Sequence, residues 1–176
     1  MRIALRGSAP VDLALVRRAM RAAARPYRIP TGAVVTLAFV DDDEMRALNK
    51  RYRRKDKTTD VLSFGDALPR GVRGTAAAER LSEDPDGVIR VGDVVISGAQ
   101  AARQARRRRS PLDAEIAFLA AHGVLHLLGF DDQTQRGYRE MLALGREAVS
   151  RARTAYSASS SVRARARALP SSSRRQ

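Results

Sequence analysis

The spacing of apolar residues along positions 1–64 predicts three strands separated by two helices. The strands are expected at 2–6, 33–40 and 58–64, where short apolar stretches occur. Between the first two, apolar side chains recur at helical spacing from Val11 to Ala23, and Pro10 suits the first turn of that helix. Three aspartates at 41–43 would cap a second helix, which continues to about Arg51.

The rest of the chain predicts one more strand and three more helices. The strand covers 87–97, where Gly92 would permit a β-bulge, and a loop rich in glycine, proline and charge precedes it at 65–87. The helices are expected to end near Arg109, to run from Pro111 to about Leu128, and to run from about Gln133 to Val149. This mixture without strict alternation favours an α+β fold, a single small mixed sheet of about four strands with roughly five helices packed on it.

Length and composition suggest the domain organisation. A chain of 176 residues can form one domain with a substantial core, which we assign to residues 1–150. Residues 151–176 consist largely of serine, alanine and arginine and are expected to form a disordered, solvated tail. No stretch is apolar enough for a signal peptide or a membrane span, so we expect a cytoplasmic protein without membrane contact.

The chain is strongly basic. Its 33 lysines and arginines exceed its 19 acids and give a net charge of +14; the tail's seven arginines account for half, so residues 1–150 keep +7. This charge favours a polyanionic partner, although arginine that merely replaces lysine on the surface would give the same composition. Residues 106–109 are four consecutive arginines at the end of a predicted helix. They would bind an RNA backbone, or they would stabilise the negative C-terminal end of that helix, and the sequence favours neither interpretation.

The strongest candidate for chemistry is HGVLHLLGFDD at 122–132, which holds both histidines of the chain, His122 and His126. Four residues apart on a helix, the two side chains share a face about 5–6 Å apart, which suits a single zinc ion. Because the chain has no cysteine, a further protein ligand has to be a carboxylate.

A carboxylate can join the histidines only if the helix ends after them. On a continued helix Asp132 would lie about 240° around the axis from His126. Gly129 stands where a left-handed residue would end the helix and turn the chain back. The sequence therefore predicts one zinc ion per chain, held by His122, His126 and Asp132 at the end of a central helix, with a fourth position open. Asp131 is a competing ligand.

The zinc-protease mechanism is not expected. Those enzymes carry a glutamate directly after the first histidine as general base, and here that position is Gly123. Ordinary polar histidines on a half-buried helix are the alternative, but they leave the glycine turn and the following acid unexplained.

These residues resemble the YbeY family of bacterial rRNA maturation factors, whose motif reads H-G-x-L-H-L-x-G-Y-D-H. Three more segments are similar to the same family in the same order: 49–64 (NKRYRRKDKTTDVLSF), 91–97 (VGDVVIS) and 115–123 (EIAFLAAHG). The resemblance implies a zinc-dependent, single-strand-type endoribonuclease that acts in small-subunit rRNA 3′ end maturation and ribosome quality control. It implies rRNA and the small ribosomal subunit as partners, with ribosomal proteins and assembly factors as further candidates, and no DNA.

The resemblance also assigns roles by motif position. His122 and His126 match the first two zinc-binding histidines, and Arg53 matches the family's functional arginine. A guanidinium can bind two phosphate oxygens at once, which suits catalysis on RNA. Asp132 replaces the family's third histidine, and Gly65 replaces a proline; aspartate is a competent zinc ligand, so the site is expected to persist.

Two other functions stay open at this point. One is a non-catalytic ribosome-assembly or RNA-binding factor in which the metal only holds the turn together. The other is a metal hydrolase of another substrate class, which Gly123 and the basic charge disfavour. No residue in the sequence stands out as a general base.

Overall fold

The fold is built on a four-stranded mixed sheet in the order β1-β2-β4-β3. In the computed structural model, the backbone is described for residues 1–167 and the side chains for residues 1–154. The strands are β1 (Arg2–Arg6), β2 (Val34–Val40), β3 (Val61–Phe64) and β4 (Arg90–Ser97). β1, β2 and β4 run parallel, whereas β3 pairs antiparallel with β4 and forms one edge. The α+β prediction with about four strands is confirmed.

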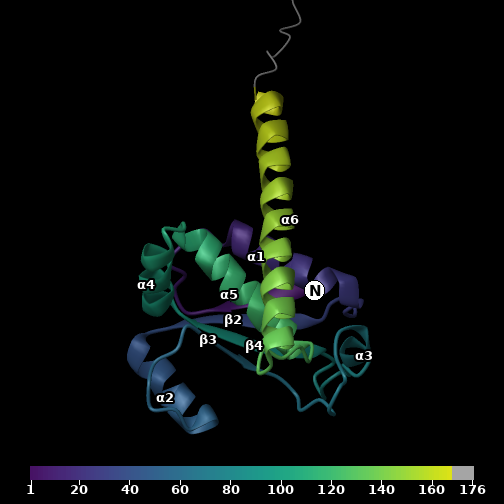
Figure 1. Ribbon diagram of the computed structural model, residues 1–176. Coiled ribbons are helices and arrows are strands. Elements are labelled where there is room, and N and C mark those ends of the chain that lie inside the picture. The colour runs from purple at the N-terminus through teal and green to yellow at the C-terminus, as the bar shows by residue number, and fades with distance from the viewer. Residues whose placement is uncertain (168–176) are drawn as a thin grey trace, which may run out of the picture.

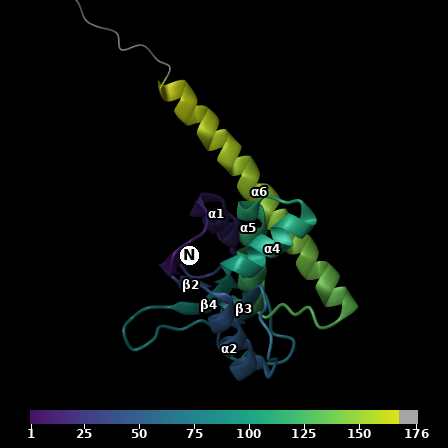
Figure 2. The ribbon, with the colours of Figure 1, turned by 90° about the vertical axis from the view of Figure 1, so that its left-hand side faces the viewer.

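Helices cover the two faces of the sheet unequally. α1 (Leu13–Ala24) and α5 (Leu112–Leu127) lie side by side over one face (Figures 1 and 2). On the same side of the sheet, α6 (Gln135–Arg167) packs across α1 and α5, and α4 (Gly98–Arg108) packs beside α5. α2 (Asp42–Arg53) lies alone on the other face. A short 3₁₀ helix, η1 (Arg25–Tyr27), follows α1. No helix in the described part combines the length and apolar character needed to cross a membrane.

α5 is the central helix of the fold. It contacts α1, α4, α6, β3 and β4, and most of its residues are buried. A helix enclosed in this way needs apolar residues around most of its circumference, which explains why its sequence lacks a polar face. The two histidines at its C-terminal end are therefore carried by the most constrained helix of the described chain.

The structure corrects two boundaries. The last helix does not end near Val149 but continues to Arg167, through part of the segment expected to be disordered. Its apolar stripe extends past that point, because Leu144, Ala148 and Ala152 follow one another at helical spacing and the last two are buried in the core. The expectation for residues 168–176 lies outside the described residues. The loop at 65–87 contains a short helix, α3 (Thr75–Ala78).

Candidate metal centre

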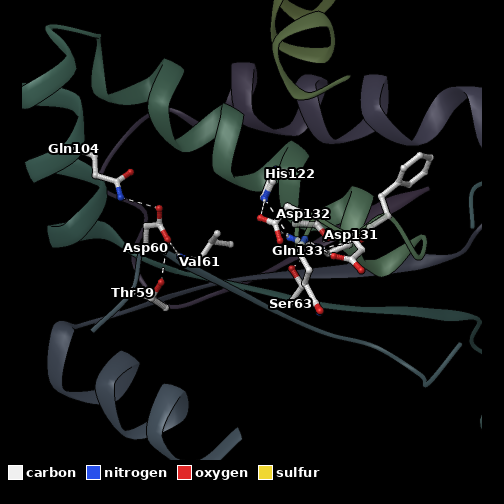
Figure 3. Close-up of polar contacts among 12 residues, drawn as sticks. Thr59, Asp60, Val61, Ser63, Gln104, His122, Asp131, Asp132 and Gln133 are labelled. Carbon is white, nitrogen blue, oxygen red and sulfur yellow. Dashed lines mark hydrogen bonds and ion pairs between the residues drawn. The ribbon is translucent and has the colours of Figure 1, made fainter. Parts of the chain in front are cut away.

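Three potential ligands converge at the C-terminal end of α5. The donor atoms of His122, His126 and Asp132 all lie within 4.8 Å of one another. The two Nε2 atoms are 3.1 Å apart, and Asp132 Oδ2 lies 3.5 Å from Nε2 of His122 and 3.9 Å from Nε2 of His126. Figure 3 shows Asp132 pointing toward His122 beside the edge strand.

This geometry fits a small divalent ion. Zinc–nitrogen bonds of about 2.0–2.1 Å at tetrahedral angles separate neighbouring ligand atoms by about 3.3 Å, close to the three distances in the site. Among the described residues, no other group of three or more His, Cys, Asp or Glu side chains comes together in this way. The three side chains, here called the metal-binding group, are thus a candidate metal site, and their imidazole and carboxylate donors also suit other divalent first-row metals.

The surroundings of the two imidazoles favour metal binding. Nδ1 of His126 lies 3.0 Å from the carbonyl oxygen of Phe130, so Nδ1–H donates and the Nε2 lone pair is left for a metal. The side chain of His122 is 12% exposed. Burial lowers the pKa of His122 below its ordinary value, His126 adds to this effect, and Asp132 opposes it. The neutral imidazole is the form that binds a metal.

A glycine turn brings Asp132 back to the histidines. Gly129 has a φ of +78°, and a Cβ at this position would collide with the carbonyl oxygen of Val72. Its N–H donates to the carbonyl of His126 at 2.9 Å, and the N–H of Phe130 donates to that of Leu125 at 3.1 Å. These two bonds form the Schellman pattern of a helix end, as the glycine predicted.

The neighbouring aspartate has a different role. Asp131 accepts a hydrogen bond at Oδ1 from the N–H of Gln133 at 2.5 Å, which closes the turn. Its side chain is not part of the metal-binding group, as Figure 3 also shows. The two acids therefore differ in position, with Asp132 among the three converging donors and Asp131 in the turn.

Gly123 faces the sheet and not the metal-binding group. A Cβ at this position would lie 2.6 Å from Cγ1 of Val94, and the Gly123 carbonyl accepts a hydrogen bond from Ser63 Oγ at 3.2 Å. A glutamate here would have to enter the contact between α5 and β4. The position that carries the general base of zinc proteases is therefore closed by packing as well as by residue type.

Arg53 is not in contact with the three ligands. It is exposed at the end of α2, on the other face of the sheet, and makes no hydrogen bond or ion pair with the residues whose side chains are described. The preceding residue, Tyr52, packs its ring 4.9 Å from that of Phe64 in the edge strand. Neighbouring residues of a strand face opposite sides of the sheet: Ser63 faces α5, to which it donates a hydrogen bond, and Phe64 faces α2. The end of α2, with Arg53, and the metal-binding group therefore lie on opposite faces of β3, near the same point along the strand.

Two acids, Glu115, which is buried, and Asp60, which is half-buried, were not singled out from the sequence. Glu115 is 4% exposed on α5 and forms an ion pair with Arg108; burial raises its pKa. Asp60 accepts hydrogen bonds from Gln104 Nε2 at 2.7 Å and from the N–H of Val61 at 2.9 Å, and its charge favours protonated His122. An acid within the apolar run of α5 was the feature that could have revealed Glu115.

Comparisons with known proteins identify the family of the chain. The model of the family "Endoribonuclease YbeY" matches residues 10–153. Proteins named Endoribonuclease YbeY from Bacillus cereus and Geobacillus thermodenitrificans are 36% and 39% identical to this chain. The matches cover 77% and 75% of this chain and 83% and 81% of the relatives. A Thermotoga maritima protein solved in solution shares the fold, with a TM-score of 0.55 at 20% identity over 98% of this chain and 99% of that one. The chain belongs to the YbeY endoribonuclease family.

Proposed function

We propose that the protein is a zinc-dependent endoribonuclease that cleaves single-stranded regions of rRNA in the cytoplasm, in the 3′ end maturation and quality control of the small ribosomal subunit. The observation that carries this proposal is the convergence of His122, His126 and Asp132 in a chain of the YbeY family. The net charge of +14 suits a polyanionic substrate and partners that contain RNA. Ribosomal proteins and assembly factors at the small subunit are the proteins that such an enzyme would meet.

Zinc is the metal that we assign to the site. Two neutral imidazoles and one carboxylate form a three-ligand set, and one zinc ion per chain is expected. A bound zinc ion would supply Lewis acidity toward a phosphoryl oxygen or a water molecule. The hydrogen bond from His126 to Phe130 orients one ligand, and the glycine turn delivers the carboxylate.

Arg53 is proposed to bind the phosphate backbone of the same RNA. It has no partner among the described side chains, so its guanidinium is available for two phosphate oxygens. An RNA strand that crosses the edge strand β3 would meet Arg53 on one face of the sheet and the metal-binding group on the other. Arg53 would then hold the substrate without touching the metal ligands.

The decisive experiment compares cleavage of an rRNA fragment by the wild-type protein and by His126→Ala, with zinc measured in both. We expect about one zinc per wild-type chain, and loss of both zinc and cleavage in the variant with the fold retained. Unfolding of the wild type on metal removal, without any RNA cleavage before it, would instead support an RNA-binding factor with a structural metal. Turnover of a peptide or ester without RNA cleavage would support a different hydrolase.

We also propose that the chain divides into a catalytic body at 1–150 and an accessory tail at 151–176. Because Ala152 is buried in the core, a truncation that tests this division should end after Thr154. We expect the zinc content to be unchanged and the free energy of unfolding to change by less than about 0.5 kcal/mol. Aggregation or early melting of this truncated chain would show that the tail is structural.

A further inference from the structure

A groove of about 680 Å³ runs between α5 and α6. Its lining includes Phe118 of α5 and Tyr138 of α6, and three arginines from α4 and α6: Arg108, Arg146 and Arg153. Along α6 the lining runs from Tyr138 past Arg146 to Arg153, so the groove has an aromatic end at Tyr138 and a basic end at Arg153. Phe118 lies between these ends, because a Cβ at Gly145 would meet its ring at 2.8 Å.

The aromatic end adjoins the metal-binding group. The ring of Phe118 stacks on that of His122 with centroids 5.8 Å apart. Tyr138 lies in the first turn of α6, directly after the turn that carries Asp132, and is 50% exposed. A strand bound at the metal could therefore continue into the groove without crossing another element.

The basic end presents two free charges on one helix face. Arg146 and Arg153 are exposed and form no hydrogen bond or ion pair with the residues whose side chains are described. They are seven residues apart in α6, so they share a face and are separated by about 10 Å along the axis.

The acid in the groove wall does not cancel these charges. Glu115 is almost fully buried and is already paired with Arg108, whose own charge it neutralises. The free positive charge therefore comes from α6. Ser110 and Ser150 also line the groove and supply hydroxyl groups of the kind that contact phosphate and sugar.

We infer that this groove binds the backbone of a single RNA strand that extends from the metal-binding group, with Arg146 and Arg153 on its phosphates and Tyr138 available to stack on a base. The inference rests on the proposed function for the identity of the ligand. Proteins that bind single-stranded nucleic acid without sequence preference combine an exposed aromatic ring with a positively charged groove, and this groove has both. An acidic peptide would use the arginines but would have no need of the aromatic end.

The test uses the full chain and fluorescence anisotropy with labelled oligouridylates of about four and about sixteen nucleotides, the ends of the range of known single-strand site sizes. The variant Arg146→Ala/Arg153→Ala is compared with Arg2→Ala/Arg6→Ala, which removes the same charge from the exposed strand β1 at the far edge of the sheet. A third variant, Arg146→Lys/Arg153→Lys, keeps the charge. Circular dichroism of each variant checks the fold.

We expect the groove variant to bind the long RNA at least about tenfold more weakly and to lose about 1.4 from the slope of log K against log salt, for two phosphate contacts. Its affinity for the short RNA should stay within about twofold of wild type, because that RNA need not enter the basic end. The β1 variant should lose less affinity for the long RNA, and the lysine variant should keep the wild-type slope.

Equal weakening by the groove and β1 variants, or equal loss for short and long RNA, would overturn the inference in favour of a general effect of net charge. Stronger competition by an oligoglutamate peptide than by RNA would overturn it in favour of a protein partner. If wild type binds the long RNA through the groove but cleaves none, the groove stands and the proposed function fails.

Discussion

α5 and α2 each carry a proposed functional side chain at the C-terminal end, but they differ in how many contacts fix that side chain in position. At the end of α5, Gly123 contacts the sheet, Gly129 closes the helix, and the carbonyl of Phe130 fixes His126. At the end of α2, Arg53 is exposed and makes no polar contact with the described side chains. The backbone after it is closed, because the N–H groups of Arg54 and Lys55 donate to the carbonyls of Lys50 and Asn49, but the Arg53 side chain takes no part in these bonds.

The difference teaches which functions are assembled before the substrate arrives. Metal ligands have to be positioned within a few tenths of an ångström, so packing and backbone geometry fix them in advance. A guanidinium that binds a flexible phosphate backbone gains its partner from the substrate, so the protein alone does not orient it. Substitutions of the ligands at the end of α5 should therefore change both metal binding and activity, and substitution of Arg53 should change activity alone.

The largest effect on activity is expected for Asp132→Ala, compared with Asp131→Ala. Asp132 is one of three converging donors, so we expect loss of zinc and of RNA cleavage. Asp131→Ala is the same chemical change one position away and removes only the hydrogen bond to Gln133, at a cost of about 1 kcal/mol. Zinc analysis, cleavage assays and urea unfolding of both variants measure this contrast. Equal zinc content in the two would remove Asp132 from the site.

The next effect is on stability, at Gly129→Ala compared with Gly32→Ala. Both glycines have positive φ, +78° and +87°, so both substitutions carry a backbone penalty of about 1 kcal/mol. A Cβ at Gly129 would also collide with a backbone carbonyl, whereas one at Gly32 meets nothing within 4 Å. We expect Gly129→Ala to cost about 2–3 kcal/mol more, from overpacking, and to lower zinc affinity. Equal unfolding free energies would mean that the turn after α5 yields easily.

At the end of α2 the expected effect is confined to catalysis. Arg53→Ala should lower kcat/KM for RNA by about tenfold or more, as for loss of a charge-assisted hydrogen bond to the phosphate backbone worth about 1.5–3 kcal/mol, and leave unfolding within about 0.5 kcal/mol. Arg51→Ala is the matched control, since residues two apart on a helix point in different directions and Arg51 lies over the ring of Tyr52 instead. Similar losses in the two variants would reduce Arg53 to one charge among many.

The same contrast explains what could be predicted from the sequence. The spacing of His122, His126 and Gly129 predicts a ligand pair and a turn because helix geometry is regular, and the structure has that arrangement. The continuation of α6 past Val149 was missed, because a run of alanine, serine and arginine resembles a tail in composition, and only the contact of Ala152 with the core distinguishes it. The position of Arg53 across the sheet depends on which face α2 covers, and no local pattern encodes that.

The smallest effect tests whether the lack of polar contacts seen for the Arg53 side chain is shared by the start of α2. The start of the helix is anchored: Asp42 accepts a hydrogen bond from Ser97 Oγ at 2.7 Å and pairs with Arg103 at 2.7 Å. These contacts, the Ser97 bond first, lower the pKa of Asp42 below its ordinary value of 3.8. A lowered pKa means that the stabilisation is complete above the ordinary value and is lost as pH falls through the native pKa.

Asp42→Asn should therefore destabilise the protein by roughly 0.5–1 kcal/mol at neutral pH, a small value because the ion pair is partly exposed. The difference from wild type should shrink as the pH falls below about 4, where the wild-type carboxylate becomes protonated as well. Asp43→Asn removes the same charge from the same exposed first turn, so it controls for the interaction with the helix dipole. Urea unfolding of the three proteins across this pH range measures the effect. If Asp42→Asn matches Asp43→Asn at every pH, the start of α2 is not anchored by Asp42, and the contrast with α5 extends to the whole helix.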